Sequence, residues 1–139
     1  MDLATAHKHI AASFERMRAL YSKPVFDEWA ILALGSQQSG VLAYAGPRAE
    51  EFRKNLNDDV GPLLEQVRGL QLEVGDFEFT NSGAGQNHDA LVKLGSTSFL
   101  VCNNTAKSMV EIRGDSRWLK AQAAFVDLCE KFRAEPLEV

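Results

Sequence analysis

Apolar residues near the start of the chain recur at spacings of three and four, the period of a helix with one buried face. The stripe consists of Leu3, Ala6, Ile10, Phe14, Met17 and Leu20 or Tyr21. Proline disfavours helical geometry at the residue before it, so Pro24 predicts that this helix ends within residues 22–24.

A solid apolar run follows, which is typical of a strand covered on both faces. The predicted strand covers Phe26–Leu34, and a second covers Val41–Gly46 after the turn "GSQQSG". The connection is too short for a parallel crossover, so we expect an antiparallel hairpin. The first strand is the most apolar of the chain, and we expect it to be central in the sheet.

A second helix is predicted after Pro47, a residue that the first helical turn accepts. Its apolar stripe is Phe52, Leu56, Val60, Leu63 and Val67. Gly69 is a good C-terminal cap, so the helix should end at about Arg68. Gly61-Pro62 interrupts the pattern and predicts either a kink or two short helices broken near Val60.

The next segments read as strands. The stretch "LQLEVGDFEFT" alternates with a change of phase at Gly75, which we interpret as a bulge. "HDALVKLG" and "TSFLVCN" each predict a further strand. "MVEIRG" predicts a short last strand, although Ser108 and Glu111 also have the spacing of a helix capping box.

The last helix should start at Asp115 or Ser116, either of which can cap it. Its apolar stripe is Trp118, Ala121, Phe125, Cys129 and Phe132, and residues 135–139 are expected to form a frayed tail. The fold class is therefore α+β, a single domain over residues 1–139. A central antiparallel sheet of five or six strands is flanked by helices in the order α-β-β-α-β-β-β-(β)-α.

Charge and composition exclude some partners. The net charge is −4 and the pI about 5.4. No basic patch is visible, which argues against nucleic acid or an anionic membrane as the main partner. The first residues lack the apolar run of a signal peptide, and no stretch is long and apolar enough to span a membrane. We expect a cytoplasmic protein.

The stretch "TNSGAGQNHDA", Thr80–Ala90, raises the question of a phosphate-binding loop. It lacks the GxxxxGK[ST] pattern and lies between two predicted strands, so no helix N-terminus faces it. We interpret it as a flexible hairpin loop that contains Asn81, Gly83, Gly85 and His88.

No catalytic, metal or cofactor site is expected from the remaining residues. Cys102 and Cys129 lie in apolar patterns without a CxxC motif, and His7 and His9 are two apart rather than four. One enzyme hypothesis remains, in which Cys102 is a nucleophile and His88 its base. A second alternative is a ligand-sensing domain of PAS or GAF type, with the small residues Ala30, Ala33, Ala43 and Ala45 leaving room for a ligand.

The order of elements resembles the roadblock and dynein light-chain family, within the profilin-like architecture. The resemblance covers about Leu3–Ala134. It is carried by "EWAILAL-GSQQSG-VLAYAG", by "PRAEEFRKNLNDDVGPLLEQVRG" and by "DALVKLGSTSFLVCNN". It implies a non-enzymatic interaction module that forms homodimers or heterodimers by joining edge strands and pairing long helices. It also implies association with a small Ras-like GTPase or a larger assembly.

On this resemblance, the pairing segments would be Arg48–Arg68 and Leu72–Thr80. The interface residues implied are Phe52, Leu56, Leu64, Leu72, Val74, Phe77 and Phe79. An exposed strand edge is a template for pairing with another chain. The alternative is that the same apolar residues form the core of a monomer.

Overall fold

The computed structural model describes residues 1–21, 26–34, 39–81, 88–104 and 114–138. Its elements confirm the α+β class and the expected order. They are α1 (Leu3–Arg18), β1 (Glu28–Leu34), β2 (Ser39–Ala45), α2 (Ala49–Leu70), β3 (Phe77–Asn81), β4 (His88–Lys93), β5 (Ser98–Asn104) and α4 (Trp118–Ala134). The predicted sixth strand "MVEIRG" and the alternative capping box fall on residues 108–113, outside the described residues.

The five strands form one sheet in the order β2-β1-β5-β4-β3, and every neighbouring pair is antiparallel. The predicted hairpin of β1 and β2 is confirmed. The expectation that the first strand would be central needs correction. β1 is an interior strand, but β5 holds the middle position. Local apolarity shows that a strand is covered, whereas its place in the order depends on pairing with a segment far away along the chain.

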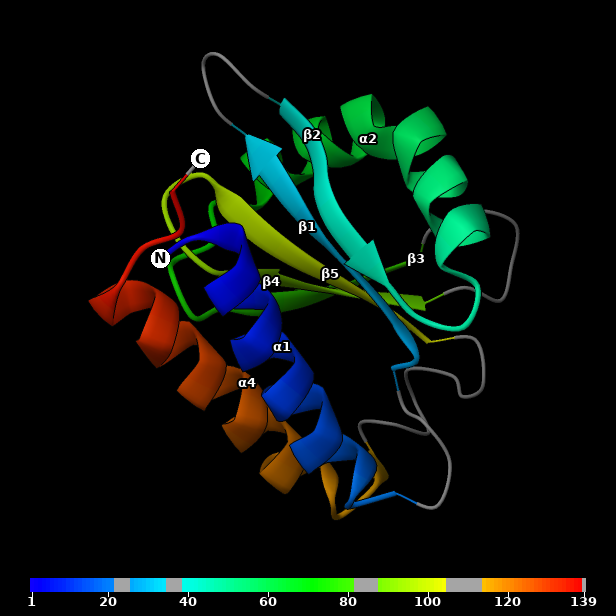
Figure 1. Ribbon diagram of the computed structural model, residues 1–139. Coiled ribbons are helices and arrows are strands. Elements are labelled where there is room, and N and C mark those ends of the chain that lie inside the picture. The colour runs from blue at the N-terminus through cyan, green and yellow to red at the C-terminus, as the bar shows by residue number, and fades with distance from the viewer. Residues whose placement is uncertain (22–25, 35–38, 82–87, 105–113, 139) are drawn as a thin grey trace.

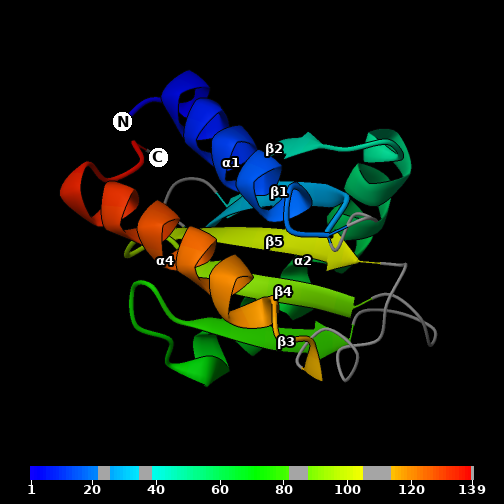
Figure 2. The same cartoon turned by 90° about the horizontal axis from the view of Figure 1, so that it is seen from below.

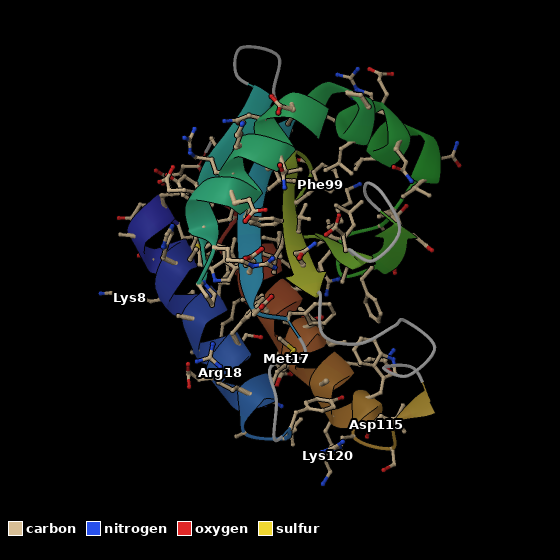
Figure 3. The ribbon with its side chains drawn as sticks, turned by 90° about the vertical axis from the view of Figure 1, so that its right-hand side faces the viewer. Lys8, Met17, Arg18, Phe99, Asp115 and Lys120 are labelled. Atoms are coloured by element: carbon tan, nitrogen blue, oxygen red, sulfur yellow. The ribbon has the colours of Figure 1, made fainter. Side chains whose placement is uncertain are left out.

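Helices cover both faces of the sheet (Figure 1). α1 and α4 lie side by side on one face and α2 lies on the other, as the view from below also shows (Figure 2). Successive side chains along each strand point to opposite faces of the sheet, so each strand contributes to the core on both sides. In β4, Ala90 and Val92 face α1 and α4, and Leu91 faces α2. Phe99 of β5 belongs to the α2 layer and is labelled beneath that helix in Figure 3.

Pro62 lies inside α2, and the hydrogen-bonded helix continues through it to Leu70. The predicted kink is seen as a bend of α2 in Figure 1, and the alternative of two separate helices is wrong. The predicted end at Arg68 is also corrected. The helix ends with Gln71 in the left-handed conformation at φ 50°, two residues beyond the expected glycine cap.

The predicted strand 70–80 begins later than expected, because residues 71–76 form a turn. Gly75 has a φ of +96° and its amide donates to Lys93 O at 3.0 Å. The Asp76 amide donates to Glu73 O at 3.0 Å. Leu72 and Val74 are therefore turn residues, and the apparent change of strand phase at Gly75 is the end of a turn and not a bulge.

Both ends of the last helix differ from expectation. α4 starts at Trp118, and Asp115 accepts a hydrogen bond from the Arg117 amide at 2.9 Å without capping the helix. The tail predicted to fray makes contacts with the start of the chain. Leu137 is buried, and the Glu138 amide donates to Met1 O at 2.9 Å. A single leucine in a polar tail gives no periodicity, so only the tertiary contact with α1 reveals its role.

Candidate functional site

The outer edge of β3 is the first candidate. Within the described residues β3 pairs with β4 alone, in a register that sets Phe77 opposite Val92 and Thr80 opposite Asp89. β2 is the other edge strand, and α2 packs over it. An edge strand presents unpaired backbone donors and acceptors, which is what a further strand needs for addition.

The flank of α4 beside β3 carries exposed apolar side chains. Leu119 is 74% exposed and Val126 46%, the two large hydrophobic side chains that stand out in the described part of the chain. Their spacing of seven places them on the same side of the helix as Arg133. Arg133 Nη2 donates to Val74 O at 2.8 Å, just before β3. Leu119 and Val126 therefore line the side of α4 that faces the β3 edge.

Phe77 holds β3 against α4. Its ring centroid lies 6.1 Å from that of Trp118, in an edge-to-face arrangement, and 6.2 Å from that of Phe125. Both partners are buried, whereas Phe77 is only partly buried. Phe77 thus joins the edge strand to α4, and we call β3 together with Leu119 and Val126 the β3/α4 edge.

The implied interface residues divide into two groups. Phe52 and Leu56 are 6% and 5% exposed and pack under α2 against the sheet, so in the single chain they are core residues, as in the alternative stated above. Leu72, Val74 and Phe77 are partly exposed near the β3 edge. The side chains of Leu64 and Phe79 lie outside the described part of the structure.

The outward side of α2 is polar where it is described. Its exposed residues include Glu51, Lys54, Asp58, Glu65 and Arg68. Two ion pairs, each spanning one turn, follow this side, between Glu50 and Arg53 and between Glu65 and Arg68. A pairing helix with this surface would present charges and not an apolar stripe.

A buried polar row crosses the sheet beneath α2, and the sequence analysis did not predict it. Glu28, Asn103 and Asp89 are 2%, 4% and 1% exposed and occupy paired positions on three neighbouring strands. Asn103 Nδ2 donates to Asp89 Oδ1 at 2.7 Å, and Arg48 Nε donates to Glu28 Oε1 at 3.1 Å. A signal existed in β4, where Asp89 is in phase with the buried Leu91.

Two opposing effects act on the pKa of the Glu28 carboxyl. Burial raises the pKa of the Glu28 carboxyl above its ordinary value, while the neighbouring Arg48 guanidinium lowers it. Arg48 is the cap residue of α2, so this ion pair joins the start of that helix to β1. The row holds the end of the sheet together, and it offers no group that reaches solvent to do chemistry.

The structure describes the other sequence candidates in part. Gly83 and Gly85 lie outside the described residues, whereas Asn81 and His88, which were expected in the loop, are strand residues that pair across β3 and β4. Burial raises the pKa of the Cys102 thiol well above its ordinary value, the opposite of what a nucleophilic cysteine needs. Among the described residues no group of His, Cys, Asp and Glu has the arrangement of a metal site.

Comparison with known proteins finds matches among solved structures. No protein-family model matches the chain, and no curated protein does. Nine chains of known structure match. One is the gliding protein MglB from Thermus thermophilus, with a TM-score of 0.46 and 12% identity over 91% of this chain and 92% of that one. The fold class here stands on the sheet order and the two helical layers. None of the described helices has the length and apolarity to cross a bilayer.

Proposed function

We propose that the protein is a non-enzymatic interaction module that forms a homodimer through the β3/α4 edge. The observation that carries the proposal is the position of Leu119 and Val126 beside a strand whose outer edge has no partner among the described residues. Backbone pairing supplies affinity in strand addition, and side chains beside the strand supply specificity.

Burial of the two exposed side chains supplies the driving force for association. Fully burying a large aliphatic side chain contributes about 1.5–3 kcal/mol, and each subunit has two such residues at this edge. A two-fold dimer uses the same surface on both subunits, so each substitution acts twice. Phe52 and Leu56, also implied for the interface, lie in the core of each subunit between α2 and the sheet.

Light scattering coupled to size-exclusion chromatography tests the dimer. The wild-type chain should elute as a dimer at micromolar concentration, and the double variant L119K/V126K should elute as a monomer with the same fold by circular dichroism. A matched control is the double variant A4K/A11K, which adds the same charges at exposed positions of α1. A wild-type chain that stays monomeric at all concentrations, or a double variant that dimerises like the wild type, contradicts the proposal.

The proposal also concerns the protein that binds the dimer. We expect a small Ras-like GTPase, as the resemblance to the roadblock family implies. Co-elution of the purified dimer with Ras-like GTPases of the same genome, loaded with GDP or with a non-hydrolysable GTP analogue, measures this directly. Binding that depends on the nucleotide supports a regulatory partner. A dimer that binds none of them in either state would leave the interaction module without its proposed GTPase.

A further inference from the structure

The layer formed by α1 and α4 has a hollow between these two helices on its outer surface. It is lined by His9, Ala12, Ser13 and Arg16 of α1 and by Ala124, Asp127, Leu128 and Lys131 of α4. Each helix contributes residues at i, i+3, i+4 and i+7, the spacing that lies on one helical face. The hollow is therefore built by two complete helical faces and not by a loop.

Small side chains leave the space open. Ala12 and Ser13 occupy the middle of the α1 face and Ala124 begins the α4 face. Ser13 Oγ donates to Ala124 O at 3.2 Å, which links the two helices. The hollow measures about 90 Å³. About 10–15 Å³ of such space is enough for one water molecule, so the hollow has room for a small tetrahedral oxyanion.

Cationic groups surround the opening. Arg16 Nη1 makes an ion pair with Asp127, which uses one of its five donor hydrogens and leaves the others for a ligand. Lys131 and His9 lie on the lining as well, and no ion pair involves either of them in the described part of the chain. The lining thus carries one acidic side chain, Asp127, and two cationic ones, Arg16 and Lys131.

The surrounding layer has the same sign, although the chain as a whole is acidic. α1 and α4 together contain six Lys and Arg residues against three Asp and Glu, whereas α2 contains three against five. The net charge of the chain is −4. An anion that approaches the protein is therefore attracted to the α1/α4 layer and repelled from α2.

We propose that the α1/α4 hollow binds a phosphate group. Its tetrahedral oxygens accept hydrogen bonds from the Lys131 ammonium and the Arg16 guanidinium, which enter from opposite helices. Charge-assisted hydrogen bonds of this kind are the strong ones, and a dianion satisfies more of the donors than a carboxylate can. The N–H of the His9 imidazole adds a third donor. This site is separate from the β3/α4 edge and does not depend on the dimer.

Isothermal titration with inorganic phosphate tests the site, with ionic strength held constant by sodium chloride because screening weakens all charge interactions. The amide signals of residues 9–16 and 124–131 in a nitrogen-15 spectrum report where phosphate binds. We expect saturable binding that shifts these signals, and weaker binding of acetate. An absence of saturable binding overturns the proposal for free phosphate.

Matched variants distinguish specific binding of phosphate in the hollow from non-specific electrostatic attraction to the surface. K131A should lower phosphate affinity about tenfold, the effect of one charge-assisted hydrogen bond. A12L keeps every charge and fills the hollow from an exposed position, so it should abolish binding. K8A and K120A remove the same charge outside the hollow, and both side chains point away from the protein in Figure 3. Equal losses in K8A and K131A, or full binding by A12L, would show that no specific site exists.

The source of the phosphate group is distinguished by two probes. Inorganic phosphate represents a free anion, and phosphatidylcholine vesicles with or without phosphatidic acid represent a lipid headgroup. Binding of the free anion with loss in A12L supports a soluble phosphate ligand. Binding of only the phosphatidic acid vesicles, with the same loss in A12L, supports a lipid source for the same site. Binding of neither overturns the proposal.

Discussion

Asn103 donates a hydrogen bond of 2.7 Å from its Nδ2 to Oδ1 of Asp89, with both side chains more than nine-tenths buried beneath α2. Burying a carboxylate costs free energy of folding unless hydrogen-bond donors compensate for the lost water, so the Asp89 side chain needs this bond. The bond also connects β4 near its first residue to β5 near its last.

Replacement of Asn103 by leucine should therefore destabilise the protein by about 1–3 kcal/mol, because the buried Asp89 carboxylate loses a donor. Urea denaturation followed by circular dichroism measures the loss. The double variant D89L/N103L should recover most of it, since removal of both polar partners leaves no desolvated charge. A double variant less stable than N103L would contradict this account.

Glu28 should make stability depend on pH in a defined direction. Burial raises the pKa of its carboxyl above the ordinary 4.5, so the folded state holds the proton more tightly than the unfolded state. This contribution is complete below the ordinary pKa and is lost as the pH rises through the folded-state pKa. The difference in unfolding free energy between wild type and E28Q should therefore fall as the pH rises above the ordinary pKa of 4.5. A difference that grows with pH would show that Arg48 outweighs burial.

Gly46 should not tolerate a side chain. Its φ is +134°, and an added Cβ would lie 2.5 Å from Asp27 O and 2.9 Å from Glu28 Cα, both backbone atoms. We expect G46A to lose about 1–2 kcal/mol or more in thermal or urea unfolding. G69A is the matched control, because nothing lies within 4 Å of its added Cβ inside α2, and it should gain about 0.5–1 kcal/mol. Equal effects of the two substitutions on stability would show that Gly46 tolerates a side chain.

The C-terminal tail should contribute to stability. Leu137 is 8% exposed and packs in the core under α1 and α4, so L137A should cost about 2 kcal/mol or more. E138A changes the next side chain, which is exposed, and should leave the midpoint of urea unfolding unchanged. A tail without a structural role would make the two variants indistinguishable.

The two cysteines should react slowly. Burial raises the pKa of the Cys129 thiol to about 11 and that of Cys102 well above its ordinary value. At pH 8 a thiol with a pKa near 11 is a thiolate in about one molecule per thousand. Iodoacetamide should therefore alkylate both far more slowly than free cysteine, and at the free rate after unfolding in urea. Rapid alkylation of Cys102 in the folded protein would revive the hypothesis of a cysteine nucleophile.

The pattern of apolar residues was sufficient for the elements that bury one regular face. α1, the β1–β2 hairpin and β4 follow their periodicities, because a period of 3.6 or 2 is a local property that the chain displays without its partners. The interpretation of "TNSGAGQNHDA" as a connection between two strands was correct for the same reason, since no helical period follows the glycines.

Tertiary structure alone decided the features that depend on contacts distant in sequence. β5 took the middle of the sheet through its pairing with β1, Leu137 entered the core through its contact with α1, and Glu28, Asn103 and Asp89 met in one row across three strands. Leu119 and Val126 emerge as exposed neighbours of an edge strand only once α4 is placed over β3. A pattern reports which residues avoid water, but the element that covers them is chosen by the packing of the whole chain.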